Sequence, residues 1–231
     1  MWKIIESSVP QMLAAGFKYT IPLAIISFFF GLILALITAL VRLTRKKGPF
    51  RIIKWIFSFY VWLFRSTPLL VQLFIVFFGL PYFKIKGIFP NGIKLEPFTA
   101  GIITFSLNTG AYASETIRAA ISSVPKGQWD AGFAMGMSKL KTLWRIILPQ
   151  AFRVALPPLS NSFISLVKDT SLAASITIME MFAVSQQLAA ENYQPLLMYS
   201  LVALIYAAFT TVLTFLQKYL EHITDRYVKA N

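Results

Sequence analysis

The ionisable side chains that could handle a charged solute are few, and several lie at the ends of long apolar stretches. Glu115 and Arg118 are three residues apart, so on a helix they share one face, and Arg65 lies at a comparable depth in a neighbouring stretch. Ionisable groups at membrane depth usually face a cavity or a partner charge. These residues could form an inner gate or a structural ion-pair cluster that fixes helix ends. Asn108, four residues after Thr104, could hydrogen-bond a zwitterion or a neighbouring helix.

A second polar group, Lys168-Asp169-Thr170-Ser171, follows an apolar stretch that contains Pro157-Pro158. Paired prolines are expected to disturb a regular helix, and transporters bind solutes where helices break at membrane depth. We therefore expect Asp169 to bind the ammonium group of a zwitterionic solute. Lys168, or free N–H groups at Thr170 and Ser171, would bind its carboxylate. The alternative is an outer-surface loop with a solvated charge pair.

Composition argues against most enzymatic chemistry. The 231-residue chain has no cysteine, one histidine (His222) near its end, and no Gly-x4-Gly-Lys-Ser/Thr phosphate-binding loop. It is 57% hydrophobic and 13% charged, whereas a soluble domain carries about 25% charged residues. A thiolate or histidine metal centre, a nucleotide site and a histidine-based catalytic centre are therefore not expected, and the composition indicates a membrane protein.

Four uncharged stretches could cross, or nearly cross, a hydrocarbon core about 30 Å thick, which takes about 20 helical residues. A fifth, Val154–Val167, becomes long enough if Ile146–Phe152 continues into it, and Thr170–Met179 is short enough to be a re-entrant or surface helix. The sequence thus predicts an all-α, polytopic membrane protein with five transmembrane helices in one domain, residues 1–231. The four long stretches are Tyr19–Val41, Ser66–Phe83, Pro97–Ser114 and Tyr193–Gln217.

The distribution of Lys and Arg predicts the orientation, because cytoplasmic connections carry the excess of positive charge. One side holds fifteen such residues: Arg42, Arg45, Lys46, Lys47, Arg51, Lys54, Arg118, Lys126, Lys139, Lys141, Arg145, Arg153, Lys218, Arg226 and Lys229. The other side holds six: Lys3, Lys18, Lys84, Lys86, Lys94 and Lys168. We therefore expect the N-terminus outside and the C-terminus in the cytoplasm. The net charge of +13 is then explained by the positive charge of the cytoplasmic connections, and no nucleic-acid partner is expected.

The connection at about residues 119–149 contains a run of small residues that this orientation places in the cytoplasm. Ala131, Gly132, Ala134 and Gly136 remove side-chain bulk from a short helix, so its backbone could sit deep in a partner's groove. Asp130 near the helix start favours the positive end of the helix dipole. Gly136 tolerates positive φ, so the chain can turn back toward the membrane. The alternative is an amphipathic interfacial helix between two spans.

This segment, from Gln128 to Gly136 with Ile146-Ile147-Leu148-Pro149 after it, resembles the "EAA-x3-G-x9-I-x-LP" loop of bacterial ABC importer permeases. Asp130-Ala131-Gly132 replaces the usual Glu-Ala-Ala and keeps the charge and the small size. Four further segments are similar to polar-amino-acid permeases: Phe64–Gln72 (FRSTPLLVQ, with Ser66 for the usual glycine), Gly110–Arg118 (GAYASETIR), Ser123–Gln128 (SVPKGQ) and Ser165–Leu172 (SLVKDTSL). Gly127-Gln128-Trp129-x-Ala131-Gly132 and Pro149–Val154 resemble cystine permeases of Gram-positive bacteria.

The resemblance implies a type I ABC importer in the bacterial cytoplasmic membrane that moves L-cystine, with arginine or glutamine as alternative solutes. The implied partners are an ABC ATPase dimer, a second identical or homologous permease, an extracellular solute-binding protein, the amino acid and membrane lipid. ATP and Mg²⁺ would be bound by the ATPase, so this chain would hold no cofactor and would not be an enzyme. Gln128, Asp130, Ala131, Gly132 and Gly136 would couple the permease to the ATPase. The loop Pro81–Pro97 could be a platform for the binding protein or a plain connection.

A passive membrane channel is the alternative function from another class. A channel would need no helix that couples it to an ATPase. An intramembrane enzyme would need a convergent catalytic set such as a Ser/His pair or facing acidic residues, and none is evident in the sequence. Co-purification of an ATPase would distinguish the importer from the channel.

Overall fold

In a computed structural model the chain is a bundle of helices. The structure describes residues 2–44, 48, 50–84, 90 and 92–226, with side chains through residue 223. Arg45, Lys46, Lys47, Lys86 and Lys229, which contributed to the predicted orientation, lie outside the described residues or side chains, as does the side chain of Arg226. The elements are α1 (Trp2–Ala15), η1 (Gly16–Thr20), α2 (Ile21–Leu43), α3 (Phe50–Ser66), α4 (Leu69–Phe74), η2 (Ile75–Gly79), η3 (Leu80–Tyr82), α5 (Pro97–Ser123), α6 (Lys126–Ala134), α7 (Lys139–Thr142), η4 (Leu143–Ile147), α8 (Leu148–Asp169), η5 (Thr170–Ile176), α9 (Met181–Asn192) and α10 (Pro195–Arg226).

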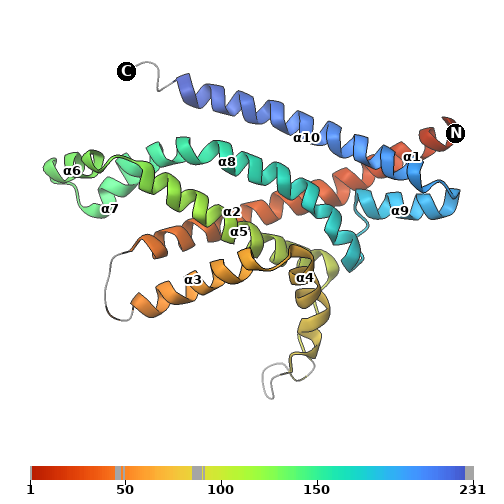
Figure 1. Cartoon of the computed structure of the whole chain (residues 1–231), viewed down its shortest axis with the longest axis horizontal. Helices are drawn as coiled ribbons and strands as arrows, with labels where there is room; N and C mark the ends of the chain where they lie inside the picture. The colour runs from red at the N-terminus through yellow and green to blue at the C-terminus, as the bar shows by residue number, and fades with distance from the viewer. Residues whose placement is uncertain (1, 45–47, 49, 85–89, 91, 227–231) are drawn as a thin grey trace.

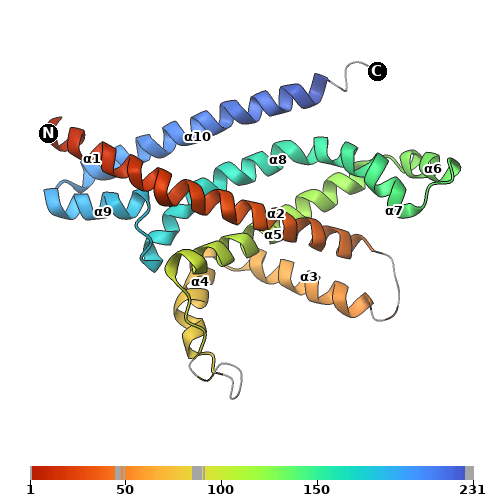
Figure 2. The same ribbon diagram turned by 180° about the vertical axis from the view of Figure 1, so that it is seen from behind.

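The long helices run along the length of the molecule, with α5 between α2 and α8 (Figures 1 and 2). The short helices α6 and α7 form one end. The N-terminus, α9 and the start of α10 form the other end, and α4 turns away from the bundle and projects from its side. The coupling segment predicted from sequence is thus separated from α9 by the length of the bundle.

The α2–α5 pair packs closely because small residues line both helices. A Cβ atom on Gly31 would lie 2.9 Å from Cβ of Thr109, and one on Gly110 would lie 3.0 Å from Cδ2 of Leu34. Close approach through small residues is a common way in which membrane helices associate. The opposite face of α2 exposes large apolar side chains, as expected of a surface that meets lipid: Ile25, Phe29, Phe30, Ile33 and Ile37.

Hydropathy identifies fewer spans than the five predicted. By length and composition, two helices of the described residues could cross a membrane, Trp2–Leu43 and Pro195–Ile223, and up to four could if each of two bent pairs is one span. The predicted first span, Tyr19–Val41, lies inside the longer helix Trp2–Leu43. The predicted last span, Tyr193–Gln217, begins too early, because Tyr193 ends α9 with a positive φ and α10 begins at Pro195. The central helix α5 covers the predicted span Pro97–Ser114 but is not among these candidates. Its many Ser, Thr and Gly residues pack against other helices, so their polarity need not face lipid.

The predicted span Ser66–Phe83 has the wrong boundaries. The helix begins at Phe50 and bends by 112° between Ser66 and Leu69, so the predicted stretch is only the bent-away second half, α4 to η3. Proline fixes the position of the bend, since it disfavours helix at the preceding residue and has no N–H to donate. The first half was missed because Arg51, Lys54 and Arg65 interrupt its apolar run.

The expected disturbance at Pro157-Pro158 is also wrong. Helix α8 follows η4 directly and continues past Arg153 and through both prolines to Asp169. The condition under which Val154–Val167 is lengthened by the residues before it is therefore met. Prolines are tolerated in membrane helices when other groups or local adjustments satisfy the freed carbonyls. The change of geometry comes later, at Thr170, where a 3₁₀ helix replaces the α-helix. The segment Thr170–Met179 buries Thr170, Ala173 and Ile176 and exposes Ser175, Thr177 and Met179, so one side of it packs on the bundle.

The side chain of Gln72 stabilises the bend between α3 and α4 through hydrogen bonds. Pro68 cannot donate to the carbonyl of Phe64, and the side-chain amide of Gln72 donates to this oxygen instead at 2.9 Å. The same amide donates to the carbonyl and hydroxyl oxygens of Thr67 at 3.0 and 2.9 Å. Gln72 is buried, so water cannot easily replace these bonds.

We expect Gln72→Leu to destabilise the protein, because it leaves the Phe64 and Thr67 carbonyl oxygens without this donor. An unsatisfied buried acceptor costs about 1–3 kcal/mol, so the thermal midpoint in detergent, followed by size-exclusion chromatography, should fall by several degrees. The matched control is Gln187→Leu, since the exposed Gln187 bonds only to Glu191 four residues on. Equal midpoints for the two variants would contradict the assigned role of Gln72.

Glu180 joins α9 to α10 and is fully buried. Its carboxylate accepts from the backbone N–H groups of Phe182 and Ala183 at 2.9 and 2.7 Å, which caps α9. It also accepts from the hydroxyl of Tyr206 on α10 at 2.6 Å. The adjacent N–H of Met181 donates to the hydroxyl of Thr20 at 3.4 Å, so one buried cluster connects three elements.

Glu180→Ala should cost more stability than Tyr206→Phe, because it removes the helix cap and also leaves the Tyr206 hydroxyl without its acceptor. Loss of a cap costs about 0.5–2 kcal/mol, and an unsatisfied buried hydroxyl adds about 1–3 kcal/mol. Thermal midpoints of the two single variants and the double variant measure this. If Tyr206→Phe lowers the midpoint of the Glu180→Ala variant by as much as it lowers the midpoint of the wild type, the two side chains are not coupled.

Candidate functional site

The end of the molecule formed by α6 and α7 carries the five residues predicted to couple to an ATPase. Asp130 and Ala131 are exposed. Gln128 is also exposed, and its side-chain oxygen accepts from Gln150 on α8 at 3.1 Å, which ties α6 to the bundle. Gly136 follows α6 with φ of +72°, a conformation that favours glycine. The predicted turn at Gly136 is therefore present.

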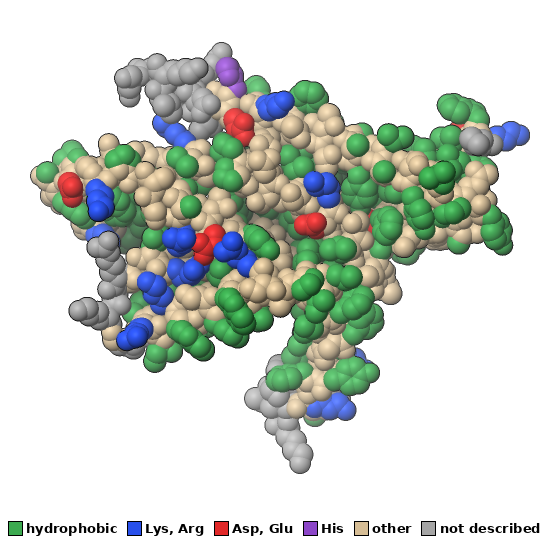
Figure 3. Space-filling model, viewed as in Figure 1, with side chains coloured by type: hydrophobic (Ala, Val, Ile, Leu, Met, Phe, Trp, Pro, Cys, Tyr) green, Lys and Arg blue, Asp and Glu red, His purple; other side chains and the backbone are tan. Residues whose placement is uncertain are grey.

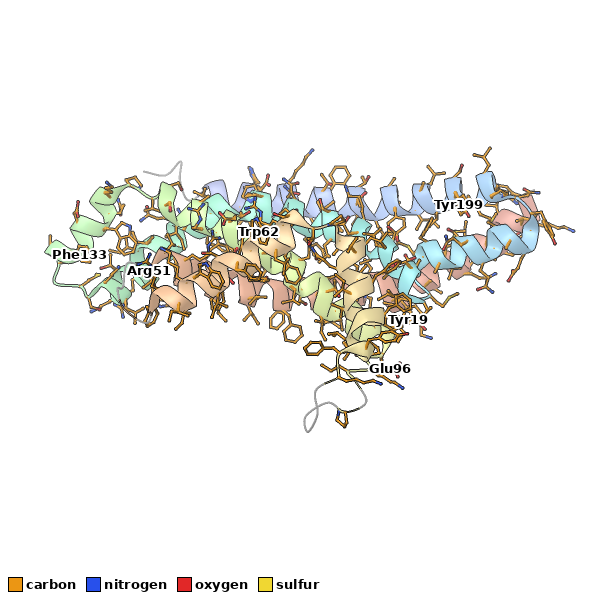
Figure 4. The ribbon with its side chains drawn as sticks, turned by 60° about the horizontal axis from the view of Figure 1, so that its bottom comes forward. Tyr19, Arg51, Trp62, Glu96, Phe133 and Tyr199 are labelled. Carbon is orange, nitrogen blue, oxygen red and sulfur yellow. The ribbon has the colours of Figure 1, made fainter. Side chains whose placement is uncertain are left out.

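The structure gives a reason for glycine at position 132 that the sequence did not suggest. It is buried, and a Cβ atom there would lie 2.5 Å from Cγ2 of Thr142. Gly132 thus lets α6 pack against α7 and does not present its face to a partner. The surface of this end instead exposes large apolar side chains, which the sequence interpretation missed: Phe133, Met135, Leu140 and Trp144. In Figure 4, Phe133 lies at this tip, far along the bundle from Tyr199.

Glu115 is the centre of an ion-pair cluster on α5. It accepts from Arg118 one turn on at 2.7 Å and from Arg42 at the end of α2. Figure 3 shows Lys and Arg side chains gathered around an acidic one over the face formed by α3 and α5. The sequence predicted the Glu115–Arg118 pair but assigned Arg42 to a connection, because the helix was expected to end at Val41.

A cavity of about 390 Å³ adjoins this cluster. Arg65, predicted to act with Glu115, lines it together with Glu115 and Arg42, but its guanidinium lies over the ring of Tyr112 at 5.5 Å from the ring centre. The structure therefore brings Arg65 and Glu115 to one cavity, with Arg42 and Arg118 as the partners of Glu115. The full lining is Arg42, Ser58, Val61, Trp62, Arg65, Ser66, Tyr112 and Glu115.

A second cavity, of about 500 Å³, contains two more of the predicted residues, Asn108 and Asp169. The amide of Asn108 donates to the side-chain oxygen of Gln72 at 3.0 Å, so the bend between α3 and α4 positions it. Asp169 reaches this cavity from the end of α8. The other lining residues are Thr67, Pro68, Leu69, Thr109, Tyr112, Asn161, Ser162, Ser165, Leu166 and Leu172.

The structure separates Asp169 from the three residues predicted to act with it. Lys168 is exposed and does not line the cavity. Thr170 is buried and its hydroxyl donates to the carbonyl of Val167 at 2.7 Å. Ser171 is half-buried and is also absent from the lining. Because α8 stays helical through Asp169, only one side chain of the four faces this space, whereas the sequence treated the segment as one loop.

The two cavities offer hydrogen-bonding groups and charges of both signs at the sides of α5. Such a lining can hold a small zwitterion, since an ammonium needs acceptors and a carboxylate needs donors. Among the described residues no group of three or more His, Asp or Glu side chains could hold a metal ion. Polar and ionic groups thus line both cavities along the helical bundle.

Comparison with known proteins finds similar sequences among transport permeases. The chain is 51% identical over 228 residues to the L-cystine transport system permease protein TcyB of Bacillus subtilis strain 168, which covers 98% of this chain and 92% of that protein. It is 34% identical to the glutamine transport system permease protein GlnP of Escherichia coli K12, covering 95% of each chain.

The fold is similar to that of solved transporters. The crystal structure of an amino acid ABC transporter with histidines superposes with a TM-score of 0.81 at 29% identity, covering 92% of this chain and 94% of the other. The MetNI methionine ABC transporter gives a TM-score of 0.69 at 19% identity, covering 97% of each chain, which supports the fold alone. This multi-pass membrane protein is a transport subunit and not itself an enzyme, as its permease relatives are. Residues 31–225 match the family of binding-protein-dependent transport system inner membrane components, and the chain belongs to that family.

Proposed function

We propose that this chain is the membrane-spanning subunit of an ATP-driven importer for L-cystine. The 51% identity to an L-cystine permease over nearly the whole chain carries the proposal. The two cavities, lined by carboxylate, amide and guanidinium groups, are chemically suited to a solute with ammonium and carboxylate groups at both ends. Five spans, with the N-terminus outside and the C-terminus in the cytoplasm, are part of this proposal.

The solute path follows α5, past Asn108 and Asp169 in the larger cavity and Arg65 and Glu115 in the smaller one. Asp169 binds the ammonium group, because it is the one carboxylate in the larger cavity's lining. Lys168 at the end of α8 and Thr170 and Ser171 at the start of η5 lie beside Asp169 in the sequence but outside the cavity's lining, so Asp169 alone of the four contacts the solute. The Glu115 cluster with Arg42 and Arg118 holds the inner ends of α2 and α5 together.

An ABC ATPase dimer docks on the end formed by α6 and α7 and supplies the ATP and Mg²⁺ chemistry. The apolar side chains Phe133, Met135 and Leu140 give this end a surface that a partner protein can cover, since exposed apolar patches mark interaction sites. Gln128, Asp130, Ala131 and Gly136 set its shape. A second copy of the chain or a homologous permease completes the path, and an extracellular binding protein delivers the solute.

Reconstitution tests the proposal. The chain is co-expressed with the ATPase and binding protein and placed in proteoliposomes, and ATP-dependent uptake of labelled cystine is measured with arginine and glutamine as competitors. Uptake blocked by unlabelled cystine alone supports the assignment. Uptake blocked by glutamine would favour the second candidate, a glutamine importer, which the likeness to GlnP suggests. Flux that needs no ATP and no ATPase would indicate a channel.

The orientation has its own test, because the chain has no native cysteine. A single cysteine placed at residue 130 or 136 should be inaccessible to a membrane-impermeant thiol reagent in intact cells and should react after the cells are opened. Labelling from outside would overturn both the orientation and the ATPase-docking assignment.

A further inference from the structure

Tyr112 lines both cavities. It lies on α5 four residues after Asn108 and three before Glu115, so these three side chains follow one face of the helix. Asn108 belongs to the larger cavity and Glu115 to the smaller one. The side chain of Tyr112 therefore stands where the two spaces meet.

The two cavities differ in charge. The larger one contains the carboxylate of Asp169 and no basic side chain. The smaller one contains Arg42, Arg65 and Glu115. A zwitterionic solute that moves from one to the other passes from an acidic compartment to a basic one, and Tyr112 lies between them.

Arg65 is the cation of the smaller cavity that is available to a solute. Within the described part of the chain, Arg42 and Arg118 are paired with Glu115, whereas Arg65 has no carboxylate partner. Its guanidinium lies over the ring of Tyr112 at 5.5 Å, and the Tyr112 hydroxyl donates to the Arg65 carbonyl at 3.4 Å. Both contacts hold the Tyr112 side chain against the start of the bend after α3.

We propose that Tyr112 is the partition between the two compartments and that Arg65 releases it when it binds the carboxylate of the solute. The inference rests on the proposed function, and it adds the residue that separates the two sections of the path. A guanidinium binds a carboxylate through two parallel hydrogen bonds, which is a stronger contact than a cation–π pair at an exposed position. An amino-acid carboxylate that arrives beside Tyr112 competes with the ring for this guanidinium, so the ring is freed and the passage opens only when solute is present.

Substitutions at Tyr112 separate this role from a purely structural one. Tyr112→Leu keeps much of the bulk but removes the ring, so Arg65 no longer has to leave a partner before it binds the solute. The dissociation constant of labelled cystine from the permease–ATPase complex in nanodiscs, without the binding protein, should fall by about two- to fivefold. Tyr112→Phe keeps the ring and should stay within about twofold of wild type. Arg65→Gln should weaken binding at least about tenfold.

Passive flux gives the second readout. Tyr112→Ala removes the partition, so cystine should leak through proteoliposomes without ATP at least about fivefold faster than through wild type. Trp62→Ala and Leu172→Ala are the matched controls, because each side chain lines one cavity only, and neither should leak. Retained ATPase co-purification shows that a variant is folded.

The proposal is overturned if Tyr112→Leu binds cystine no more tightly than wild type, or if the folded Tyr112→Ala variant does not leak. These results leave the proposed function intact as long as the wild-type complex imports cystine. A wild-type complex that imports no cystine refutes the proposed function instead, whatever the Tyr112 variants do.

Discussion

Replacing Gly136 with valine should lower ATP-driven uptake at least tenfold while the ATPase still hydrolyses ATP. Gly136 has φ of +72°, where an ordinary L-residue costs about 1–2 kcal/mol and a β-branched residue is a stronger outlier. A Cβ atom there would meet nothing within 4 Å, so the effect is conformational and not a clash. The turn after α6 would be misplaced, and the docked end could no longer transmit movement of the ATPase. Uptake and ATP hydrolysis measured on the same proteoliposomes check this.

Two further variants isolate the backbone effect. Gly127→Val is the matched control, because a Cβ atom at Gly127 also meets nothing within 4 Å but its φ is not positive, so uptake should change little. Gly136→Asn should recover most of the activity, since asparagine adopts positive φ more readily than other residues. If Gly127→Val and Gly136→Val reduce uptake equally, the loss reflects a covered surface and not the turn.

Asp169→Asn should lower cystine uptake at least tenfold without loss of folding or of ATPase binding. The change keeps the shape of the side chain and removes the negative charge that the proposed path offers to an ammonium group. A charge-assisted hydrogen bond is about twice as strong as a neutral one. Initial uptake rates, compared at equal amounts of assembled complex, measure the effect.

Lys168→Gln provides the neighbouring control for Asp169. It also removes one charge at the end of α8, but Lys168 is exposed and outside both cavities, so uptake should stay within about twofold. Unchanged uptake and selectivity in Asp169→Asn would remove Asp169 from the solute path. A large loss in Lys168→Gln would show that net charge at this position matters more than contact with the cavity.

The bend after α3 shows where sequence reasoning reaches its limit. The expected span Ser66–Phe83 ran through Pro68, where the helix in fact bends. The amide that satisfies the freed Phe64 carbonyl comes from Gln72, and Asn108 on another helix contacts both groups. Helix boundaries were misplaced at Phe50–Ser66 because charged residues in a membrane helix can face a cavity or a partner charge, which hydropathy cannot see. Conversely, Pro157-Pro158 looked like a break and is not one, because proline is tolerated where neighbouring groups satisfy the backbone.

Some features were determined by the sequence itself: the all-α membrane class, the family, the small-residue segment at Gln128–Gly136 and the positive φ expected of Gly136. These depend on composition, local spacing and backbone sterics, which act over a few neighbouring residues. Only the tertiary structure decided that Gly132 packs on Thr142, that Arg42 pairs with Glu115, and that Asn108 and Asp169 meet in one cavity while Thr170 does not. The Arg42–Glu115 and Asn108–Asp169 relations join helices far apart in the chain, and Gly132–Thr142 joins two consecutive helices. They follow from which face each helix buries, and that is fixed by packing.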